Sequence, residues 1–255
     1  MIDLHCHILP GLDDGATDMT VSLQMARQAV EQGINCIIAT PHIRSKSYNV
    51  TKSMVKESVQ ALNEELLSQN IPLKIFPGHE IRVTSAFEDE FSAGEYCYLD
   101  EEGKYLLVEF SSTFVPETAE QLIYNLTCDD VIPVIAHPER NAIFHSNPDL
   151  LCTLVEAGAL TQITAGSLSG KFGKQVQKFS YQLVKNNLAH VIASDAHNTS
   201  GRGFFMREAY EKIGKTFGEH TKRSFEDNAQ LVFSGSSIKK RQPMPITRRI
   251  FPNMF

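Results

Sequence analysis

The sequence predicts an α/β fold, a distorted TIM-like barrel of the (β/α)7 type, and three observations support this prediction. Seven short apolar runs, each rich in Ile, Val, Leu or Phe, recur along the 255-residue chain. Amphipathic helical patterns separate most of these runs, and strands that alternate with helices pair in parallel through crossovers. The chain has no dinucleotide-binding glycine fingerprint, which favours a closed barrel over an open, doubly wound sheet.

The seven runs have the length and composition of buried strands. They read IDLHCHI (2–8), INCIIAT (34–40), PLKIFP (72–77), YLLVEFS (105–111), VIPVIAH (131–137), LTQIT (160–164) and AHVIAS (189–194). After the first run, residues 17–33 begin with capping residues, show apolar side chains at helical spacing and stop at Gly33. Further helices are expected to begin near Thr51, Pro116, Asn147, Lys171, Arg202 and Lys222.

A single domain is expected over residues 1–238, followed by a basic C-terminal tail over 239–255. The tail contains three prolines and ends in aromatic residues. Such a segment is either solvated and partly ordered, or a contact arm for an acidic partner or a membrane surface. No other linker, repeat or low-complexity tract divides the chain.

Bulk properties exclude several classes of protein. The net charge of −6 argues against a general nucleic-acid binder. No run approaches the roughly 20 apolar residues that a transmembrane helix requires, and no signal-peptide pattern begins the chain. The five cysteines are odd in number and show no CxxC spacing. This pattern is typical of reduced thiols, so a cytoplasmic protein is expected.

Side chains that bind metals cluster at the ends of six apolar runs. In the first run, side chains alternate with period two, so Asp3, His5 and His7 are expected to share one face. An acidic pair, Asp13–Asp14, follows. The later runs deliver His42, Glu80, Glu109, His137, Asp195 and His197. In a β/α barrel the carboxyl ends of the strands form the active-site face, so these side chains are expected to converge there.

The chemistry of these side chains points to divalent metals. Imidazole and carboxylate without thiolate suit Zn, Mn, Fe or similar ions. About nine candidates are too many for one catalytic ion, so two or three metals with a bridging carboxylate are expected. Clustered metals are the usual device for hydrolysing phosphate esters. Arg140 lies three residues after His137, and its guanidinium is expected to grip phosphate oxygens in the same site.

The ordered series of motifs resembles a known family. HCH at 5–7, DDG at 13–15, PH at 41–42, GHE at 78–80, HPER at 137–140 and SDAH at 194–197 resemble the polymerase and histidinol phosphatase (PHP) superfamily. The wider segments DLHCHILPGLDDGA, VIAHPERN and TAGSLSGKFG look like the bacterial manganese-dependent protein-tyrosine phosphatases of capsule and exopolysaccharide operons. The resemblance covers nearly the whole chain in order.

The resemblance implies the PHP fold with a trinuclear site for Mn²⁺, with Fe, Zn or Mg as alternatives. His5, His7, Glu80 and Asp195 would hold one metal. Glu80 would bridge to a second metal, held also by Glu109 and His137. Asp14, His42 and His197 would hold the third. The sequence does not choose between Asp14 and the adjacent Asp13. Many relatives in the wider superfamily carry His where Glu109 stands, and Glu agrees with the tyrosine phosphatase branch.

The same resemblance implies the substrate and its biology. The substrate would be phosphotyrosine on a cognate bacterial tyrosine kinase, especially in its tyrosine-rich C-terminal tail, and the reaction would regulate polysaccharide synthesis. Arg140, Glu80 and Asp195 are expected to carry the catalysis without a phosphoenzyme. Arg140 would neutralise charge on the phosphoryl oxygens. Loss of Glu80 would cost the most activity, because a bridging ligand serves two ions.

Three other functions stay open at this point. A small-molecule phosphatase of the histidinol phosphate type would use the same fold and metals. An amidohydrolase also begins with HxH, but such enzymes often place a modified Lys where Glu109 stands. A regulatory module would bind metal without turnover. A cysteine-based phosphatase is not expected, because no Cys is followed six positions later by Arg, and the serine-elbow and phosphate-loop motifs are absent.

Four further features of the sequence lie near the predicted site. His79 precedes Glu80, Arg202 follows the SDAHN segment, and AGSLSGKFGK is rich in Gly and Ser near a strand end. A structural role is favoured for each of these over a contact with ligand or phosphate. Cys6 lies between His5 and His7, and it is expected to point away from them as a packing residue.

Overall fold

The computed structural model describes residues 1–43, 48, 50–84, 87, 91 and 96–246. Every apolar run of the sequence contains a strand. The strands are β1 (Ile2–Cys6), β2 (Cys36–Ala39), β3 (His42–Ile43), β4 (Lys74–Pro77), β5 (Glu80–Arg82), β6 (Tyr105–Glu109), β7 (Ile132–Ala136), β8 (Leu160–Thr164) and β9 (Val191–Ala193). The short strands β3 and β5 were not predicted, and they carry His42 and Glu80.

All strand pairs are parallel and lie in two sheets, β1-β2-β4 and β3-β5-β6-β7-β8-β9. Two-residue breaks separate β2 from β3 and β4 from β5, so the chain makes seven passages through the described barrel. The first and last passages close it: the N–H of Asp195 donates to His5 O at 2.8 Å, and the N–H of His7 donates to Ala196 O at 2.9 Å. The prediction of a distorted (β/α)7 barrel is confirmed.

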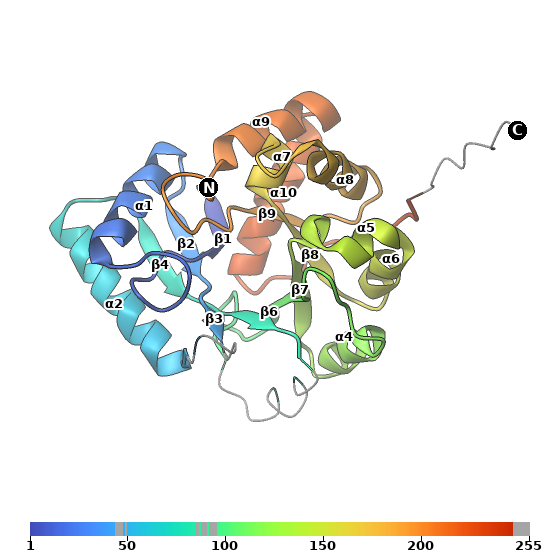
Figure 1. Ribbon diagram of the computed structural model, residues 1–255, viewed down its shortest axis with the longest axis horizontal. Coiled ribbons are helices and arrows are strands. Elements are labelled where there is room, and N and C mark those ends of the chain that lie inside the picture. The colour runs from blue at the N-terminus through green and yellow to red at the C-terminus, as the bar shows by residue number, and fades with distance from the viewer. Residues whose placement is uncertain (44–47, 49, 85–86, 88–90, 92–95, 247–255) are drawn as a thin grey trace, which may run out of the picture.

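Helices surround the strands (Figure 1). They are α1 (Met19–Glu31), α2 (Lys52–Ser68), α4 (Ala119–Cys128), α5 (Ala142–Ser146), α6 (Pro148–Glu156), α7 (Ala165–Ser169), α8 (Lys174–Lys185), α9 (Met206–Phe217) and α10 (Glu219–Phe233). The predicted cap of α1 is present, since the Asp18 carboxylate accepts from Val21 N–H at 3.0 Å. The two five-residue helices α5 and α7 were not predicted, because one or two turns carry too little periodicity to recognise.

Successive side chains of the strands contribute to two apolar cores, one inside the barrel and one between the strands and the helices. Leu4, Leu107, Val134 and Leu160 belong to a cluster inside the barrel, whereas Leu106, Val108 and Ile135 belong to the outer cluster, which includes residues of the surrounding helices. The inner cluster also contains Ala229 and Val232 of α10, and it contacts the first residues of β1 and β7. Helix α10 therefore covers the amino-terminal end of the barrel, and the opposite end is left for the polar side chains.

One sequence expectation about β1 is wrong. Asp3 does not share a face with His5 and His7: it accepts hydrogen bonds from the backbone N–H of Ser194 at 2.8 Å and from its hydroxyl at 2.5 Å. The register of β1 against β2 shifts between Asp3 and Cys6. This irregularity breaks the period of two, so the chain turns His5 inward although Leu4 already points inward. Cys6 is buried in the outer core, as expected.

Part of the predicted tail packs on the barrel. The N–H of Met244 donates to Asn186 O at 2.9 Å, and Ile246 is buried. Residues 247–255 lie outside the described residues, and the domain boundary at 238 stays a prediction. The described helices lack the length and apolar character that crossing a bilayer requires.

His190, directly before β9, gives the fold a pH dependence. Its Nδ1 accepts from Thr161 N–H at 3.1 Å, and burial, with Lys240 nearby, lowers its pKa from 6.5 to about 3. The unfolded chain therefore binds a proton that the folded chain rejects, and stability falls as the pH drops from about 6.5 towards 3. We expect this residue to contribute a slope of up to about 1.4 kcal/mol per pH unit.

Urea unfolding at pH 7, 6 and 5, with chelator present, measures this slope. The variant His190→Asn keeps an acceptor for Thr161 N–H but does not titrate, so its free energy of unfolding should depend less steeply on pH. Equal slopes in the wild type and the variant would show that His190 is protonated equally in both states.

Candidate metal centre

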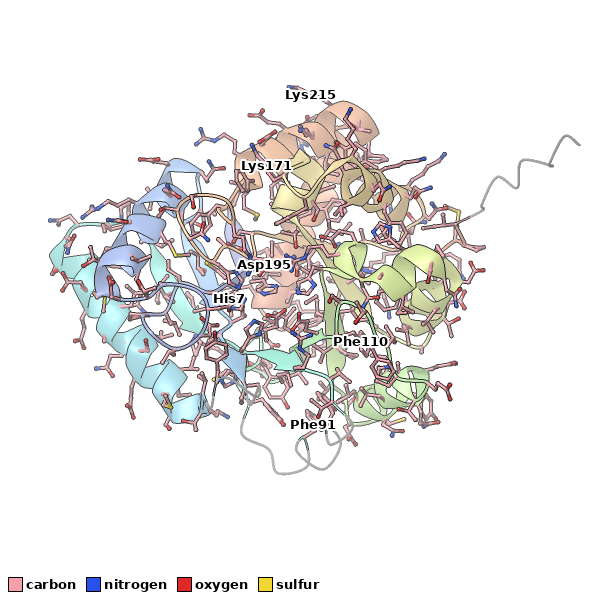
Figure 2. The ribbon with its side chains drawn as sticks, viewed as in Figure 1. His7, Phe91, Phe110, Lys171, Asp195 and Lys215 are labelled. Carbon is pink, nitrogen blue, oxygen red and sulfur yellow. The ribbon has the colours of Figure 1, made fainter. Side chains whose placement is uncertain are left out.

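The structure brings the nine predicted metal ligands together at the carboxyl ends of the strands. They are His5, His7, Asp14, His42, Glu80, Glu109, His137, Asp195 and His197. Figure 2 shows His7 and Asp195 near the centre of the ring of elements. Most of these side chains are fully buried, and Asp14 and His42 are the more exposed ones.

Four donor atoms form a compact group around one point. His5 Nε2 lies 3.1 Å from His7 Nε2, 3.4 Å from Glu80 Oε2 and 3.3 Å from Asp195 Oδ1. His7 Nε2 lies 3.4 Å from the same Glu80 oxygen and 3.5 Å from the same Asp195 oxygen. Four donors at about 2.1 Å from a tetrahedral ion would lie about 3.4 Å apart. The measured separations therefore fit a divalent metal.

Hydrogen bonds to the far ring nitrogens fix how the two imidazoles face this point. His7 Nδ1 donates to the Asp13 carboxylate at 2.6 Å. His5 Nδ1 lies 2.9 Å from Gln162 Oε1, an oxygen that also accepts from His137 N–H at 3.4 Å. Gln162 Oε1 is thus an acceptor and His5 Nδ1 the donor. Nε2 is therefore the basic nitrogen of both rings, as metal ligation requires.

The pKa values of the two histidines show that this point attracts positive charge. Burial lowers the pKa of His5, but the carboxylates of Glu80 and Asp195 outweigh burial and raise that pKa above its ordinary value. Burial likewise opposes a charge on His7, and Asp13 outweighs it, so the pKa of His7 lies well above its ordinary value. A field that favours a proton at Nε2 also favours a metal cation there.

Glu80 also reaches the next group of ligands. Its second oxygen, Oε1, lies 3.0 Å from His137 Nε2, and His137 Nε2 lies 3.6 Å from Glu109 Oε1. Burial and the adjacent Glu80 raise the pKa of Glu109 to about 8. Burial, with Arg140 nearby, lowers the pKa of His137 to about 4, which keeps its imidazole neutral for ligation. The two oxygens of Glu80 thus face two different donor sets, as a bridging ligand would.

The third group lies nearest to solvent. Asp14 Oδ1 is 3.5 Å from His42 Nε2 and 3.4 Å from His197 Nε2. The structure gives the two adjacent aspartates different places, which the sequence left open. Asp14 faces the imidazoles, whereas Asp13 supports His7 and accepts from His42 N–H at 3.0 Å. Gly15 permits this loop, because a Cβ there would overlap the backbone carbonyl of His7.

Two ligand positions have unusual backbone conformations. His137 and Asp195 adopt φ angles of 34° and 51°, in the left-handed region that residues with a side chain rarely occupy. Alternation along β7 would turn His137 outward after the inward Ala136, and its conformation brings the ring into the site instead. Strain of this kind is typical of functional sites.

Three arginines flank the ligands. Arg140 Nη2 lies 2.5 Å from Asp195 Oδ2, and Arg202 Nη2 lies 3.4 Å from the same oxygen. Arg82 pairs with Glu109 at 2.8 Å. Burial opposes ionisation of Asp195, but Arg140 and His5 hold its pKa well below the ordinary value. The predicted place of Arg140 in the site is thus observed, and Arg202 also lies here.

Sequence reasoning missed two residues of the site. Arg82 follows Glu80 by two positions in one strand, and period two was the signal that could have found it. Gln162 lies in the middle of the LTQIT run, where a single amide gave no signal. His79 lies outside the ligand groups: its Nδ1 accepts from Cys97 N–H at 2.9 Å. AGSLS forms helix α7.

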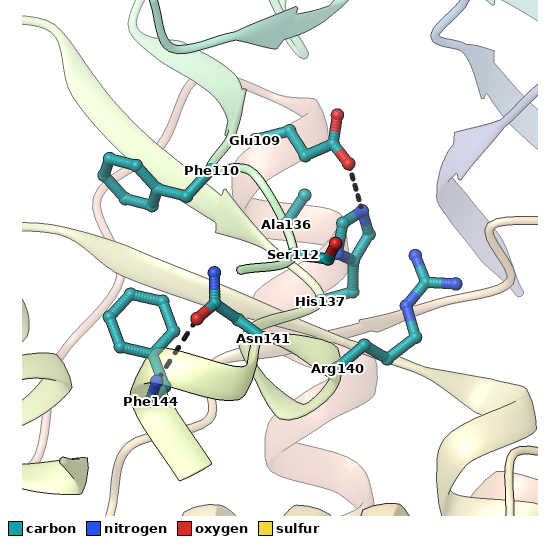
Figure 3. A pocket seen from close by; sticks show the side chains of 8 residues that line it. All are labelled: Glu109, Phe110, Ser112, Ala136, His137, Arg140, Asn141 and Phe144. Atoms are coloured by element: carbon teal, nitrogen blue, oxygen red, sulfur yellow. Dashed lines mark hydrogen bonds and ion pairs between the residues drawn. The ribbon is translucent and has the colours of Figure 1, made fainter. Parts of the chain in front are cut away.

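A cavity of about 260 Å³ adjoins the ligands (Figure 3). Glu109, His137 and Arg140 form its polar side, and Phe110 and Phe144 form its aromatic side. Asn141 supports this wall, since its carbonyl oxygen accepts from the N–H groups of Ile143 and Phe144. The cavity therefore combines a cationic group and two candidate metal ligands with an apolar wall.

Comparison with known proteins decides the family. A family model described as capsular polysaccharide synthesis, CpsB/CapC, matches residues 1–234. The chain belongs to the CpsB/CapC family. Tyrosine-protein phosphatase YwqE of Bacillus subtilis (strain 168) is 47% identical to it over 249 residues, 98% of each chain. The putative tyrosine-protein phosphatase CapC of Staphylococcus aureus is 36% identical over 244 residues, 95% of each chain.

Solved structures agree with this membership in the CpsB/CapC family. A chain from the crystal structures of YwqE from Bacillus subtilis and CpsB from Streptococcus pneumoniae, described as metal-dependent tyrosine phosphatases, matches with a TM-score of 0.94. The identity is 46%, covering 97% of this chain and 100% of that one. An organophosphorus hydrolase from Deinococcus radiodurans shares the fold alone, with a TM-score of 0.54 and 12% identity over 91% of this chain and 92% of that one.

Gln162 should control metal affinity through His5. In Gln162→Leu the His5 ring loses the acceptor that holds Nδ1–H, so the ring can turn away or present the wrong nitrogen. We expect the dissociation constant for Mn²⁺ to rise by about 10- to 100-fold. Competition with a fluorescent chelator measures it. Gln175→Leu, an exposed change on α8, is the matched control, and equal Mn²⁺ affinity in both variants would contradict this role.

Proposed function

We propose that this protein is a metal-dependent protein-tyrosine phosphatase. One observation carries the proposal: basic imidazole nitrogens and carboxylate oxygens from opposite ends of the chain converge at the separations of a metal shell. The names of the similar proteins support the reaction, because YwqE and CapC are both named tyrosine-protein phosphatases.

The proposed ligand sets follow the three groups of donors. His5, His7, Glu80 and Asp195 would hold one ion, Glu80 would share a second with Glu109 and His137, and Asp14, His42 and His197 would hold a third. Bound divalent ions supply an activated water and offset negative charge on the phosphoryl oxygens. We propose Mn²⁺ as the ion, with Fe, Zn or Mg as alternatives that suit most of the same donors.

The chain's own cations bind and orient the phosphate. Arg140 and Arg202 reach Asp195 from two directions, so their guanidinium groups border the place where the phosphoryl oxygens would lie. A guanidinium there can hold two oxygens at once and stabilise the charge that grows in the transition state. Phe172 keeps the Arg140 guanidinium in place, 5.4 Å from its ring centroid.

Two features support direct hydrolysis of an aryl phosphate. Burial raises the pKa of the Cys6 thiol well above its ordinary value, so this cysteine does not supply a thiolate nucleophile. The wall of the cavity beside Glu109 contains Phe110 and Phe144, both almost fully buried, so this wall is apolar where the ring of a substrate would lie. A phenolate leaves readily, because tyrosine has a pKa near 10. A tyrosine kinase tail as the substrate and the cytoplasm as the location belong to the same proposal.

Phosphate release from a phosphotyrosine peptide tests the proposal. Metal-stripped protein should release none, and added Mn²⁺ should restore release, with the peptide preferred over histidinol phosphate run beside it. A preference for histidinol phosphate would mean that the substrate is a small molecule, and it would leave the fold assignment unchanged. No release from either compound by metal-loaded protein would overturn the proposed activity.

Glu80 should be the most sensitive single ligand. Glu80→Gln removes the negative charge and replaces one of the two oxygens that face the two donor sets, so kcat/KM towards the peptide should fall by a factor of about 10³ or more, together with a loss of bound metal. Glu156→Gln, a change on α6 remote from the ligands, controls for loss of charge. A Glu80→Gln variant with normal activity and metal content would contradict the bridging role.

A further inference from the structure

A second cavity lies at the other end of the barrel. Its volume is about 770 Å³, and helices α8 and α10 and the chain after Ile238 enclose it. The residues that matter here are His190, Ser224, Asn228, Lys239, Lys240 and Arg241, and we call this space the lower cavity. His190 directly precedes β9, whereas Asp195 and His197 follow it, so the lower cavity is separate from the metal centre.

His190 presents a hydrogen-bond donor that no protein group uses. Its Nδ1 accepts from Thr161 N–H at 3.1 Å, and the Thr161 hydroxyl donates to Leu188 O at 2.6 Å. Nδ1 is therefore unprotonated and the ring proton resides on Nε2. Within the described part of the chain, the buried Nε2 has no hydrogen-bond partner, and only 4% of the His190 surface is exposed. A buried donor without a partner is costly unless a ligand or water accepts from it.

Three consecutive cationic residues line the lower cavity. Lys239, Lys240 and Arg241 follow one another in the chain, and all three line the cavity. Lys240 Nζ donates to Gly158 O at 2.9 Å, and Arg241 Nη2 donates to His220 Nε2 at 3.2 Å. These partners are uncharged, so neither contact neutralises the cations. Asp227 is the one carboxylate among the lining residues that the structure describes, which leaves an excess of positive charge.

Hydroxyl and amide groups complete the lining. Ser224 and Thr221 of α10 also line the cavity, and Asn228 holds the backbone beside His190 by donating to His190 O at 2.8 Å. Cationic side chains, hydroxyls and a neutral imidazole N–H are the donors that phosphate oxygens accept from. The volume falls in the range of small-molecule sites, about 300–1,000 Å³.

We propose that the lower cavity binds a small phosphate-bearing anion, which accepts from His190 Nε2–H and neutralises Lys240 and Arg241. The anion would bridge the barrel to the segment 239–242. This site is independent of the metal centre and of the proposed phosphatase activity.

Titration with inorganic phosphate, followed by NMR of the histidine rings, tests the proposal. The full-length protein, loaded with diamagnetic Mg²⁺ or Zn²⁺, carries ¹⁵N-labelled histidine, and the signals missing from His190→Asn identify His190. Phosphate should shift the His190 Nε2 signal saturably, with a dissociation constant on the order of millimolar. In the double variant K240Q/R241Q that affinity should fall by about tenfold or more. The matched control K174Q/K215Q removes two exposed cations from α8 and α9, and it should bind like the wild type.

Two outcomes would overturn the proposal. One is a His190 signal that phosphate leaves unchanged while the signals of the metal-centre histidines move. The other is an equal loss of affinity in both double variants, which would show that phosphate responds to the overall surface charge and not to a site in the lower cavity. Trypsin supplies a readout that does not depend on His190: bound phosphate should slow cleavage after Lys239, Lys240 and Arg241, and an unchanged rate would contradict the bridge.

Discussion

The close approach of buried imidazole and carboxylate donors is the constraint on which the rest of the structure depends. The Nε2 atoms of His5 and His7 and the carboxylates of Glu80 and Asp195 face one small volume, from which water is nearly excluded. An unfolded chain would never hold them so close. The barrel does, because parallel strands deliver their carboxyl ends to one place, and because Asp13 and Gln162 lock the two rings. Because folding holds the donors in place, the folded chain binds cations more tightly than the unfolded chain does. A bound cation stabilises the fold for the same reason.

The two ends of the barrel have different roles: the amino-terminal end contributes to stability, and the carboxyl end carries the functional side chains. At the amino-terminal end, α10 places Ala229 and Val232 against the inner apolar cluster and excludes water. At the carboxyl end, the strands are irregular where they carry function. The register of β1 shifts before His5, β2 and β4 break before His42 and Glu80, and His137 and Asp195 adopt left-handed backbone. A left-handed residue costs about 1–3 kcal/mol, and the packed opposite end supplies stability against that cost.

Sequence patterns predicted the seven passages and the convergence of the nine candidate ligands, because apolar runs and strand-end polar residues are local signals. These patterns failed where the backbone departs from the regular two-residue alternation of a strand. Asp3 was expected beside His5, and a single shift of register places it against Ser194 instead. Gln162 escaped notice because an amide becomes informative only when its partners, His5 and His137, are known from the fold. The different places of Asp13 and Asp14 likewise depend on the path of the loop at Gly15, which the sequence did not reveal.

The seam between β1 and the segment after β9 has a consequence for synthesis of the protein. His5 leaves the ribosome 190 residues before Asp195, which shares its donor group. His5 and His7 therefore lack the other members of their donor group until nearly the whole barrel has been translated. Closure over such a long loop is slow compared with local helix formation. The donor group around His5 is thus complete only after the segment that follows β9 has been made, and a nascent chain arrested before the last strand lacks a complete site.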